Sequence, residues 1–441
     1  MATFKSHATF FFFFSIVAFS CAALEPNKLT KNTAIYFPIR KNQTSLQYYT
    51  TINMGNQTKV NVDALLDLGA QSVWIDCRSY LSTSYKRAPC GSNECKKAMG
   101  SVCLDCNSTP RPGCSNDACG VYAFNPYSEY LIAQELGEDT IRASSTDGRH
   151  VLAEYDVPKF QFSCADADII QGLPGDHTKG LVGLARTQVS LASQISSSFN
   201  LPPKFVLCIP SSSESIGDMY IGGGPYYMPP TIGEKSLSFA RTPLVVNPIS
   251  TAPVSSEGSP SDEYFISVKH IEINGKQVSF NPSLLSFDKN GVGGTKISTI
   301  APYTILHASI YEPLVKDFVK EATLKTIKRV TSVTPFGACF DSKTISKSIT
   351  GPAVPDIDLV LEGNTISEKF TLSGSNLMVE AKKNVMCLAI VDGGSEPRTS
   401  IVLGGHQLEN RFLEFDLSTS ILGFTPSLLL SKQICSHSRL I

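Results

Sequence analysis

The chain has 441 residues, 42% of them hydrophobic, and its 38 basic and 39 acidic residues leave a formal net charge of -1. That length is enough for two hydrophobic cores, because single cores stop growing at roughly 250–300 residues. The balanced charge, with no basic or acidic tail, gives no long-range attraction toward nucleic acid or an anionic membrane, so neither is expected as a partner.

The N-terminus is the first segment with a clear pattern. Lys5 precedes the apolar run 8–23, which ends in small residues. A positive charge, an apolar stretch and an Ala-x-Ala-like end are typical of a secretory signal peptide, and the run is short for a membrane span of about 20 residues. We therefore expect residues 1–23 to be cleaved and the remaining chain to be secreted into the extracellular space.

Cysteine usage agrees with secretion. Removal of Cys21 leaves twelve cysteines, an even number that allows up to six disulfides in an oxidising compartment. Cys103 and Cys106 form a CxxC pair that a zinc or redox site would also show, but no histidine is near, so disulfides are the preferred interpretation. The pairing within the cluster of six from Cys90 to Cys119 stays open, because six cysteines allow 15 connectivities. Three Asn-x-Thr sequons mark possible glycan sites, at Asn42, Asn56 and Asn107.

The secondary-structure pattern predicts an all-β fold. Runs rich in β-branched and aromatic residues recur between turn signals. Asn274-Gly275 lies between two such short runs and predicts a tight hairpin, since a type I′ turn needs positive φ at both central residues. The predicted strands include 48–54, 60–66, 72–76, 265–273, 401–403 and 412–417, and the few predicted helices are 189–198, 309–322 and 342–348.

A composition shift divides the chain. Residues 222–262 are rich in Gly, Pro and Ser, so we place a boundary near residue 236, between an N-terminal β lobe (24–235) and a C-terminal β lobe (236–441). The two halves also carry a faint duplication. An apolar strand leading into a turn, at 64–69 and again at 295–300, is followed later by an apolar-apolar-Gly element, at 181–184 and again at 401–405.

These elements resemble the pepsin-like aspartic proteases over essentially all of the mature length, which implies a bilobal fold with a few short helices. In that family an Asp-Thr/Ser-Gly loop from each lobe supplies one carboxyl of a pair that shares a proton and activates a water. The first loop matches at Leu65-Leu-Asp67-Leu-Gly69 followed by Ser72-Val-Trp74. Asp67 then occupies a catalytic position, but Leu68 replaces the hydroxyl residue that ties the two loops together.

The second loop is broken. By resemblance, the run from Gly293 to Ile300 places Ser298 where the second aspartate belongs and Ile300 where glycine belongs. A serine carries no negative charge, and no positioned histidine is there to activate it. The stretch 125–130, which corresponds to the family's flap, has no glycine. Tyr127 or Tyr130 could be a displaced flap tyrosine, but ordinary strand residues are the preferred interpretation. The sequence therefore predicts that the protein is not an enzyme.

Other catalytic and cofactor motifs are missing from the sequence. There is no serine-hydrolase elbow, no His-Glu-x-x-His and no phosphate-binding loop, and the histidines are scattered. No cofactor and no metal are therefore expected. His406, which directly follows Gly404-Gly405, is retained as a candidate surface contact.

Within the pepsin-like group the chain is most similar to plant extracellular glycoproteins: carrot dermal glycoprotein, xyloglucan-specific endoglucanase inhibitors, wheat xylanase inhibitors and soybean basic 7S globulin. The matching strings are Asp67-Leu-Gly69 with Trp74-Ile-Asp-Cys77, Lys296-Ile-Ser-Thr-Ile300 with Pro302-Tyr-Thr304, 393–401, and Gly404-Gly-His-Gln-Leu-Glu409. The resemblance implies a monomer in the apoplast or cell wall that binds and inhibits a secreted microbial glycoside hydrolase. It also implies disulfides Cys339 to Cys387 and Cys208 to Cys435.

Arg398 is the candidate inhibitory residue, and His406 is assigned to the same inhibitory interface. Arg398 follows Pro397 in a loop that is rich in Gly and Ser by composition, and a guanidinium can bridge the paired carboxylates of a glycoside hydrolase cleft. A solvated surface arginine is the alternative. Two other functions also stay open: an active or residual aspartic endopeptidase, and a storage or peptide-binding role like that of the 7S globulins.

Overall fold

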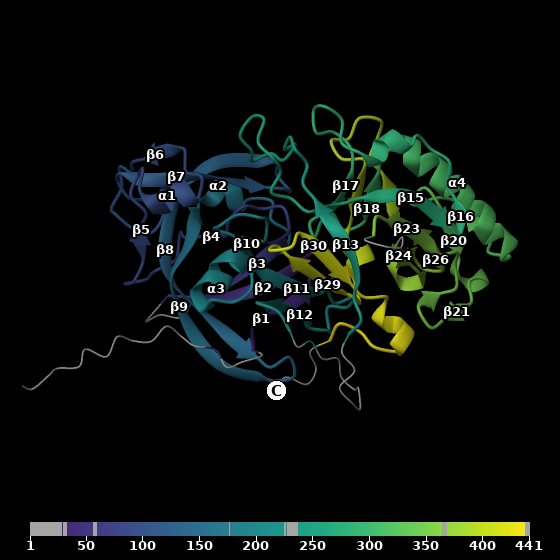
Figure 1. Ribbon diagram of the computed structural model, residues 1–441, viewed down its shortest axis with the longest axis horizontal. Helices are drawn as coiled ribbons and strands as arrows, with labels where there is room; N and C mark the ends of the chain where they lie inside the picture. The colour runs from purple at the N-terminus through teal and green to yellow at the C-terminus, as the bar shows by residue number, and fades with distance from the viewer. Residues whose placement is uncertain are drawn as a thin grey trace, which may run out of the picture.

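The computed structural model describes residues 29, 33–55, 60–175, 177–224, 226, 237–363 and 368–436. The expected signal peptide (1–23), the sequon at Asn56 and the expected lobe boundary near residue 236 lie outside these residues. Within them the chain is mostly strands with few helices, so the all-β prediction is confirmed. Two lobes flank a central sheet (Figure 1).

The central sheet joins the two lobes. Its antiparallel strands follow the order β1-β12-β11-β29-β30-β13. The first three strands of this order come from the first half of the chain, and the other three come from the second half. The neighbours β11 and β29 form the seam, with Phe205 opposite Phe415 in register and their rings stacked with centroids 4.7 Å apart. The strands are β1 (Ala34–Lys41), β11 (Lys204–Cys208), β12 (Gly217–Ile221), β13 (Ala240–Val245), β29 (Phe412–Asp416) and β30 (Ile421–Phe424).

The N-terminal lobe is built around a long twisted hairpin. Strands β8 and β9 pair antiparallel over most of their length, and β8 also pairs with β7 through the turn 126–129. The strands of this lobe are β2 (Tyr48–Met54), β3 (Val60–Asp67), β4 (Trp74–Asp76), β5 (Lys86–Arg87), β6 (Val102–Leu104), β7 (Ala118–Asn125), β8 (Tyr130–Thr146), β9 (Val151–Ala165) and β10 (Thr178–Gly183).

The C-terminal lobe holds smaller sheets. One has the order β16-β15-β23-β24 and another the order β19-β20-β26-β25. Its strands are β14 (Phe265–Ile266), β15 (Val268–Ile273), β16 (Lys276–Gln277), β17 (Thr295–Ile297), β18 (Thr304–Leu306), β19 (Arg329–Val330), β20 (Cys339–Asp341), β21 (Lys347–Ser348), β22 (Gly351–Pro352), β23 (Ile357–Leu361), β24 (Glu368–Leu372), β25 (Met378–Lys382), β26 (Val385–Leu388), β27 (Ile390–Asp392) and β28 (Ile401–Leu403).

Helices are short except for α4, which packs on β15 at the outer side of the C-terminal lobe (Figure 1). Residues 342–348, expected to be helical, form only the 3₁₀ turn η2 (Ser342–Thr344) before β21 begins. No helix among the described residues is long and apolar enough to cross a membrane. The helices are α1 (Asn93–Lys97), α2 (Ala167–Ile170), α3 (Leu191–Phe199), α4 (Ala308–Leu324) and α5 (Gly405–Leu408).

The duplication predicted from the sequence is confirmed by strand register. In the first lobe β3 runs parallel to β10, with Asp67 opposite Gly183, and β10 pairs antiparallel with β4. In the second lobe β17 runs parallel to β28, with Ile297 opposite Leu403, and β28 pairs antiparallel with β18. One residue further along this register, Ser298 comes opposite Gly404. Asp67 and Ser298 therefore hold equivalent positions in the two lobes.

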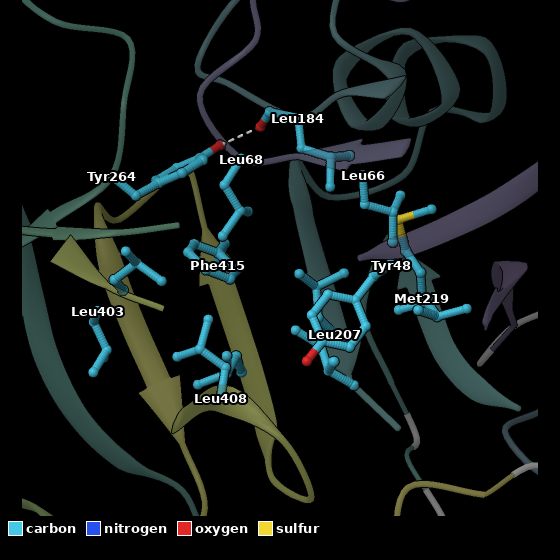
Figure 2. Close-up of a cluster of buried hydrophobic side chains, with 14 of the residues drawn as sticks. Tyr48, Leu66, Leu68, Leu184, Leu207, Met219, Tyr264, Leu403, Leu408 and Phe415 are labelled. Atoms are coloured by element: carbon cyan, nitrogen blue, oxygen red, sulfur yellow. Dashed lines mark hydrogen bonds between the residues drawn. The ribbon is translucent and has the colours of Figure 1, made fainter. Parts of the chain in front are cut away.

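The core lies directly beneath these two positions. Leu68 is fully buried and lies beside Phe415 of the central sheet, as Figure 2 shows. The Tyr264 hydroxyl donates a hydrogen bond of 2.7 Å to the carbonyl of Leu184, which ties the start of the second lobe to the loop after β10 (Figure 2). The buried core and this hydrogen bond therefore hold in place the backbone of the loops that carry the candidate site.

Six disulfides staple the chain. Cys208 pairs with Cys435 and Cys339 with Cys387, the two pairs that the family resemblance implies. The cluster left open by the sequence pairs among itself, and Cys103 and Cys106 take different partners, so they do not form a shared CxxC site. The other pairs are Cys77–Cys164, Cys90–Cys103, Cys95–Cys119 and Cys106–Cys114.

Candidate functional site

Asp67 lies at the end of β3, where the chain leaves the buried strand for a tight turn. Its Oδ1 accepts a hydrogen bond of 2.7 Å from the backbone N–H of Gly69. Burial raises the pKa of the Asp67 carboxyl to about 6; the Gly69 N–H opposes this rise, and the nearby Glu263 carboxylate adds to it. The site thus contains a carboxyl group that takes up a proton in mildly acidic solution.

Ser298, at the equivalent position of the second lobe, turns its hydroxyl toward its own loop. The Ser298 Oγ accepts hydrogen bonds from the N–H groups of Ile300 and Ala301, each 3.2 Å long. A carboxylate in the family's intact loops would carry charge here, whereas the serine hydroxyl only closes a local turn. The position therefore contributes neither charge nor a base.

A single threonine keeps the two loops tied together. The Thr299 hydroxyl donates to the Leu66 carbonyl at 2.7 Å and accepts from the Leu68 N–H at 3.2 Å. The reciprocal contact is lost, because Leu68 has no hydroxyl and its side chain packs into the core. The sequence predicted the loss at Leu68 but not the surviving contact from Thr299.

An ion pair that sequence reasoning missed stands next to Asp67. Lys296 Nζ lies 2.8 Å from Glu263 Oε1, and both side chains are largely buried. A Cβ placed on Gly69 would lie 3.1 Å from Glu263 Oε1 and 3.3 Å from Asp67 Oδ1, so the two carboxylates face the same small space. The signal available in the sequence was the acidic pair Asp262-Glu263 directly before a predicted strand.

Tyr127 lies in the turn between β7 and β8, so the preferred interpretation as a strand residue was wrong and the alternative of a displaced flap tyrosine fits it better; Tyr130 is the first residue of β8. The Tyr127 hydroxyl is buried and has no hydrogen-bond partner among the described residues. Burial, together with the charge of Asp67, raises the pKa of Tyr127, which places its hydroxyl near that carboxylate. Asn125 shapes the turn by accepting from the Tyr127 N–H at 2.9 Å.

This arrangement lacks the chemistry of a carboxyl pair. Two facing carboxyls share one proton because like charges so close together cannot both ionise, and the pair can then hold and activate a water. Here the carboxylate nearest Asp67 is Glu263, and its charge is balanced by Lys296. Ser298 supplies no replacement. Asp67 can bind a proton or a hydrogen-bond donor, but it has no partner carboxyl with which to share a proton.

Arg398 lies on the surface of the second lobe, in the loop that precedes β28. Its side chain is exposed, Nη1 donates to the Thr251 carbonyl at 3.1 Å, and its own carbonyl accepts from the Gly293 N–H at 3.0 Å. The preceding loop is fixed by the Gly394 carbonyl, which accepts from the Ala308 N–H at 2.8 Å. The guanidinium is therefore presented from an anchored loop and keeps donors for a partner.

His406 lies in a different place. Its side chain is only 12% exposed, and its Nδ1 is 3.5 Å from Glu409 Oε2. Glu409 also contacts Lys41 Nζ at 2.6 Å and the Tyr48 hydroxyl at 2.7 Å, both from the first lobe. Of the two proposed contact residues, Arg398 is the one that a partner protein can reach, whereas His406 helps to join the lobes.

Two of the three sequons fall in the described chain. Asn107 is exposed, in the loop closed by Cys106–Cys114. Asn42 is half-buried, and its Oδ1 accepts from the N–H groups of Thr44 and Ser45. Glycosylation at either remains a prediction, with Asn107 the more accessible acceptor.

Comparison with known protein families gives two matches in tandem. A model described as "Xylanase inhibitor N-terminal" matches residues 48–223, and one described as "Xylanase inhibitor C-terminal" matches residues 263–426. A Nicotiana benthamiana protein named "Probable aspartic proteinase GIP2" is 45% identical over 405 residues, which covers 91% of each chain. Gamma conglutin 1 of Prunus dulcis is 38% identical, covering 85% of this chain and 82% of the relative.

Solved structures give the same picture. The crystal structure titled "edgp" superimposes with a TM-score of 0.88 at 43% identity, covering 92% of this chain and 98% of that one. Basic 7S globulin from soybean superimposes with a TM-score of 0.78 at 30% identity, covering 92% and 100%. Identity at this level extends the similarity beyond the fold to the sequence of both lobes.

Proposed function

Because the chain belongs to the pepsin-fold family of xylanase inhibitors, EDGP and basic 7S globulins, we propose that it is a secreted protein without proteolytic activity that inhibits microbial cell-wall-degrading glycoside hydrolases. The observation that carries the first part is the single unpaired carboxyl: Asp67 faces an ion pair, and Ser298 holds the equivalent position. The family match supports the second part.

Arg398 is the proposed inhibitory contact. Glycoside hydrolases act with two carboxylates in an open cleft, and a guanidinium fork can contact both oxygens of a carboxylate at once. Its loop is held by backbone hydrogen bonds, so little conformational entropy is lost when it docks. The contact with Thr251 uses one nitrogen of the guanidinium and leaves the others for the partner.

The decisive experiment is an inhibition assay against a panel of secreted xylanases and xyloglucanases. We expect Arg398→Ala to weaken inhibition of a susceptible enzyme by about 2 kcal/mol or more, and Arg398→Lys to recover only part of it, because an ammonium lacks the planar fork. Arg111→Ala is the matched control, since Arg111 is also exposed and also donates to a backbone carbonyl. Full inhibition by Arg398→Ala would move the contact to another loop.

Proteolysis and storage are the alternatives, suggested by the names of relatives. Purified protein should leave a denatured protein substrate intact between about pH 3 and pH 6, the range around carboxyl pKa values. Cleavage that pepstatin blocks would establish the endopeptidase alternative. A chain that inhibits no hydrolase in the panel and cleaves nothing would favour the storage or peptide-binding role.

A further inference from the structure

Five lysines gather at one end of the sheet β19-β20-β26-β25. In this antiparallel order the start of β19, the end of β20, the start of β26 and the end of β25 all lie at the same end of the sheet. The lysines occupy the segments next to those strand ends, and we call them the lysine edge: Lys325, Lys328, Lys343, Lys382 and Lys383.

Backbone hydrogen bonds join these segments into one surface. The Asp341 N–H donates to the Lys328 carbonyl at 2.9 Å, and the Lys328 N–H donates to Thr344 Oγ1 at 3.0 Å. The Ser342 N–H donates to the Asn384 carbonyl at 3.0 Å, which links the turn that carries Lys383 to the end of β20. With strands about 4.8 Å apart, the edge spans roughly 15 Å.

The charge of the edge is not balanced locally. All five lysines are exposed, and none forms an ion pair with another described residue; the paired lysines on nearby elements are Lys276 and Lys369. Within the segments 325–328, 341–344 and 382–384 the single acidic residue is Asp341, which is half-buried and accepts from the Lys343 N–H. Glu380 lies two residues before Lys382, further from the edge. The overall charge of -1 conceals this local excess.

We propose that the lysine edge binds an anionic polysaccharide, a polyuronate that carries a carboxylate on each sugar ring. Lysine ammonium groups are compact, hydrated charges that suit a repeating row of carboxylates without fixing one geometry. The binding surface is separate from Arg398, so the chain can be retained on an acidic polymer while its inhibitory loop stays available. This inference goes beyond the proposed function and does not depend on hydrolase inhibition.

The composition of the edge favours this polymer over other polyanions. Phosphate recognition in nucleic acids and signalling peptides favours the bidentate fork of arginine, whereas the five cations of the edge are lysines. The neighbouring Arg329, at the start of β19, is exposed and donates to the Gly337 carbonyl at 3.2 Å. Single-stranded nucleic acid also needs aromatic side chains on which bases stack, and these three segments contain none. Six disulfides are typical of proteins in an oxidising compartment such as the extracellular space, which disfavours an intracellular polyanion as the partner.

The test measures binding of the full mature chain to polygalacturonate at pH 6 and low ionic strength. We expect binding that is lost with the fully methyl-esterified polymer and that weakens steeply toward about 0.15 M salt. The triple variant Lys328→Gln, Lys343→Gln, Lys383→Gln should bind at least about tenfold more weakly. The matched control Lys86→Gln, Lys96→Gln, Lys97→Gln removes three exposed, unpaired lysines from the first lobe and should bind like the parent.

Each other outcome overturns the proposal. If both triple variants bind more weakly to the same extent, the net charge of the protein and not the lysine edge is responsible for binding. If the esterified polymer binds as well as the free acid, the protein does not recognise the carboxylates. Tighter binding to duplex DNA or to phosphatidylserine vesicles would assign the edge to a different partner. Hydrolase inhibition by the edge variant should equal that of the parent, so failure here is distinguishable from failure of the proposed function.

Discussion

At the residue scale, Asp67 is a carboxyl retained in a place where its charge is costly. Its pKa of about 6, above the usual 3.8, means that the folded protein holds a proton there more tightly than the unfolded chain does. The sign follows: between about pH 4 and pH 6 the unfolded state loses this proton first, so stability falls as pH rises through that window. Above about pH 6 the carboxyl is ionised in both states, so its destabilising effect on the folded protein no longer changes with pH.

Asp67→Asn removes that pH-dependent cost. We expect the variant to be more stable than the parent by up to about 2 kcal/mol at pH 7.5, and to differ little at pH 4, where the parent's Asp67 is protonated. Thermal unfolding of both proteins across pH 4–8 measures this. A stabilisation that is the same at both pH values would show that ionisation of Asp67 is not its cause.

Ser298→Asp restores the missing carboxyl but not the site. The new carboxylate would sit near the Lys296–Glu263 ion pair, and the residue after Thr299 would still be Ile300 instead of glycine. We expect no pepstatin-sensitive cleavage of a denatured protein substrate between about pH 3 and pH 6. Circular dichroism should confirm an unchanged fold, and measurable proteolysis by this single variant would contradict the account of inactivity.

Residues in contiguous strings were predictable, whereas those brought together by folding were not. Asp67 and Ser298 stand in recognisable local motifs, so the sequence located both. Glu263 and Lys296 lie 33 residues apart in sequence and meet only when β14 pairs with β17. Tyr127, on another hairpin, is close enough for the charge of Asp67 to raise its pKa. The sequence offered it only as the less favoured flap tyrosine, because the stretch has no glycine.

At the element scale, strands with a clear apolar alternation were predicted closely, including β2 and β28, and the Asn274-Gly275 turn has positive φ at both residues. The long β8–β9 hairpin was not predicted. The first four residues of β9 are exposed, so it lacks the buried alternation that marks a strand. The helix expected at 342–348 failed because Lys347 and Ser348 pair as a strand with β22.

The disulfides differ in how strongly they should restrict the conformations of the unfolded chain. Cys208–Cys435 joins β11 to the end of the chain across 227 residues, whereas Cys106–Cys114 closes only 8. If loop-closure entropy dominates, replacing Cys208 and Cys435 by serine should lower the free energy of unfolding by roughly 5 kcal/mol. The same replacement of Cys106 and Cys114 should lower it by roughly 2–3 kcal/mol. Denaturant unfolding of the two double variants measures the difference. A larger loss from the short loop would rule out chain entropy as the main contribution.

At the scale of the whole molecule, the lobes are joined by a buried charge cluster as well as by the central sheet. Glu409 of the second lobe contacts Lys41 and Tyr48 of the first. Although burial alone would raise it, the pKa of Glu409 is lowered, because His406 and Lys41 favour its charged form. Its contribution to stability is therefore present above about pH 4.5 and is lost as pH falls through the lowered pKa.

Glu409→Gln keeps the shape of the side chain and leaves Lys41 buried without a counter-charge. We expect a loss of roughly 3 kcal/mol in unfolding free energy at pH 7, and a smaller difference from the parent in acid. Lys276→Gln breaks a pair in which the lysine is 70% exposed, and it should cost much less than the Glu409 variant. Equal losses from the two variants would show that the interlobe cluster contributes no more than a surface pair.

The interleaved central sheet also sets an order of events during biosynthesis. The ribosome synthesises β11 long before its partner strand β29. The edge of β11 that pairs with β29 is therefore unpaired when the first lobe emerges. The cysteines from Cys77 to Cys164 find partners within the first half of the chain, but Cys208 must wait for Cys435. Until residues 412–435 have been synthesised, the nascent chain therefore has an unpaired Cys208 thiol and an unpaired edge on β11. A chain truncated before Phe412 should consequently be recovered mainly as aggregate, even though its first lobe is fully synthesised.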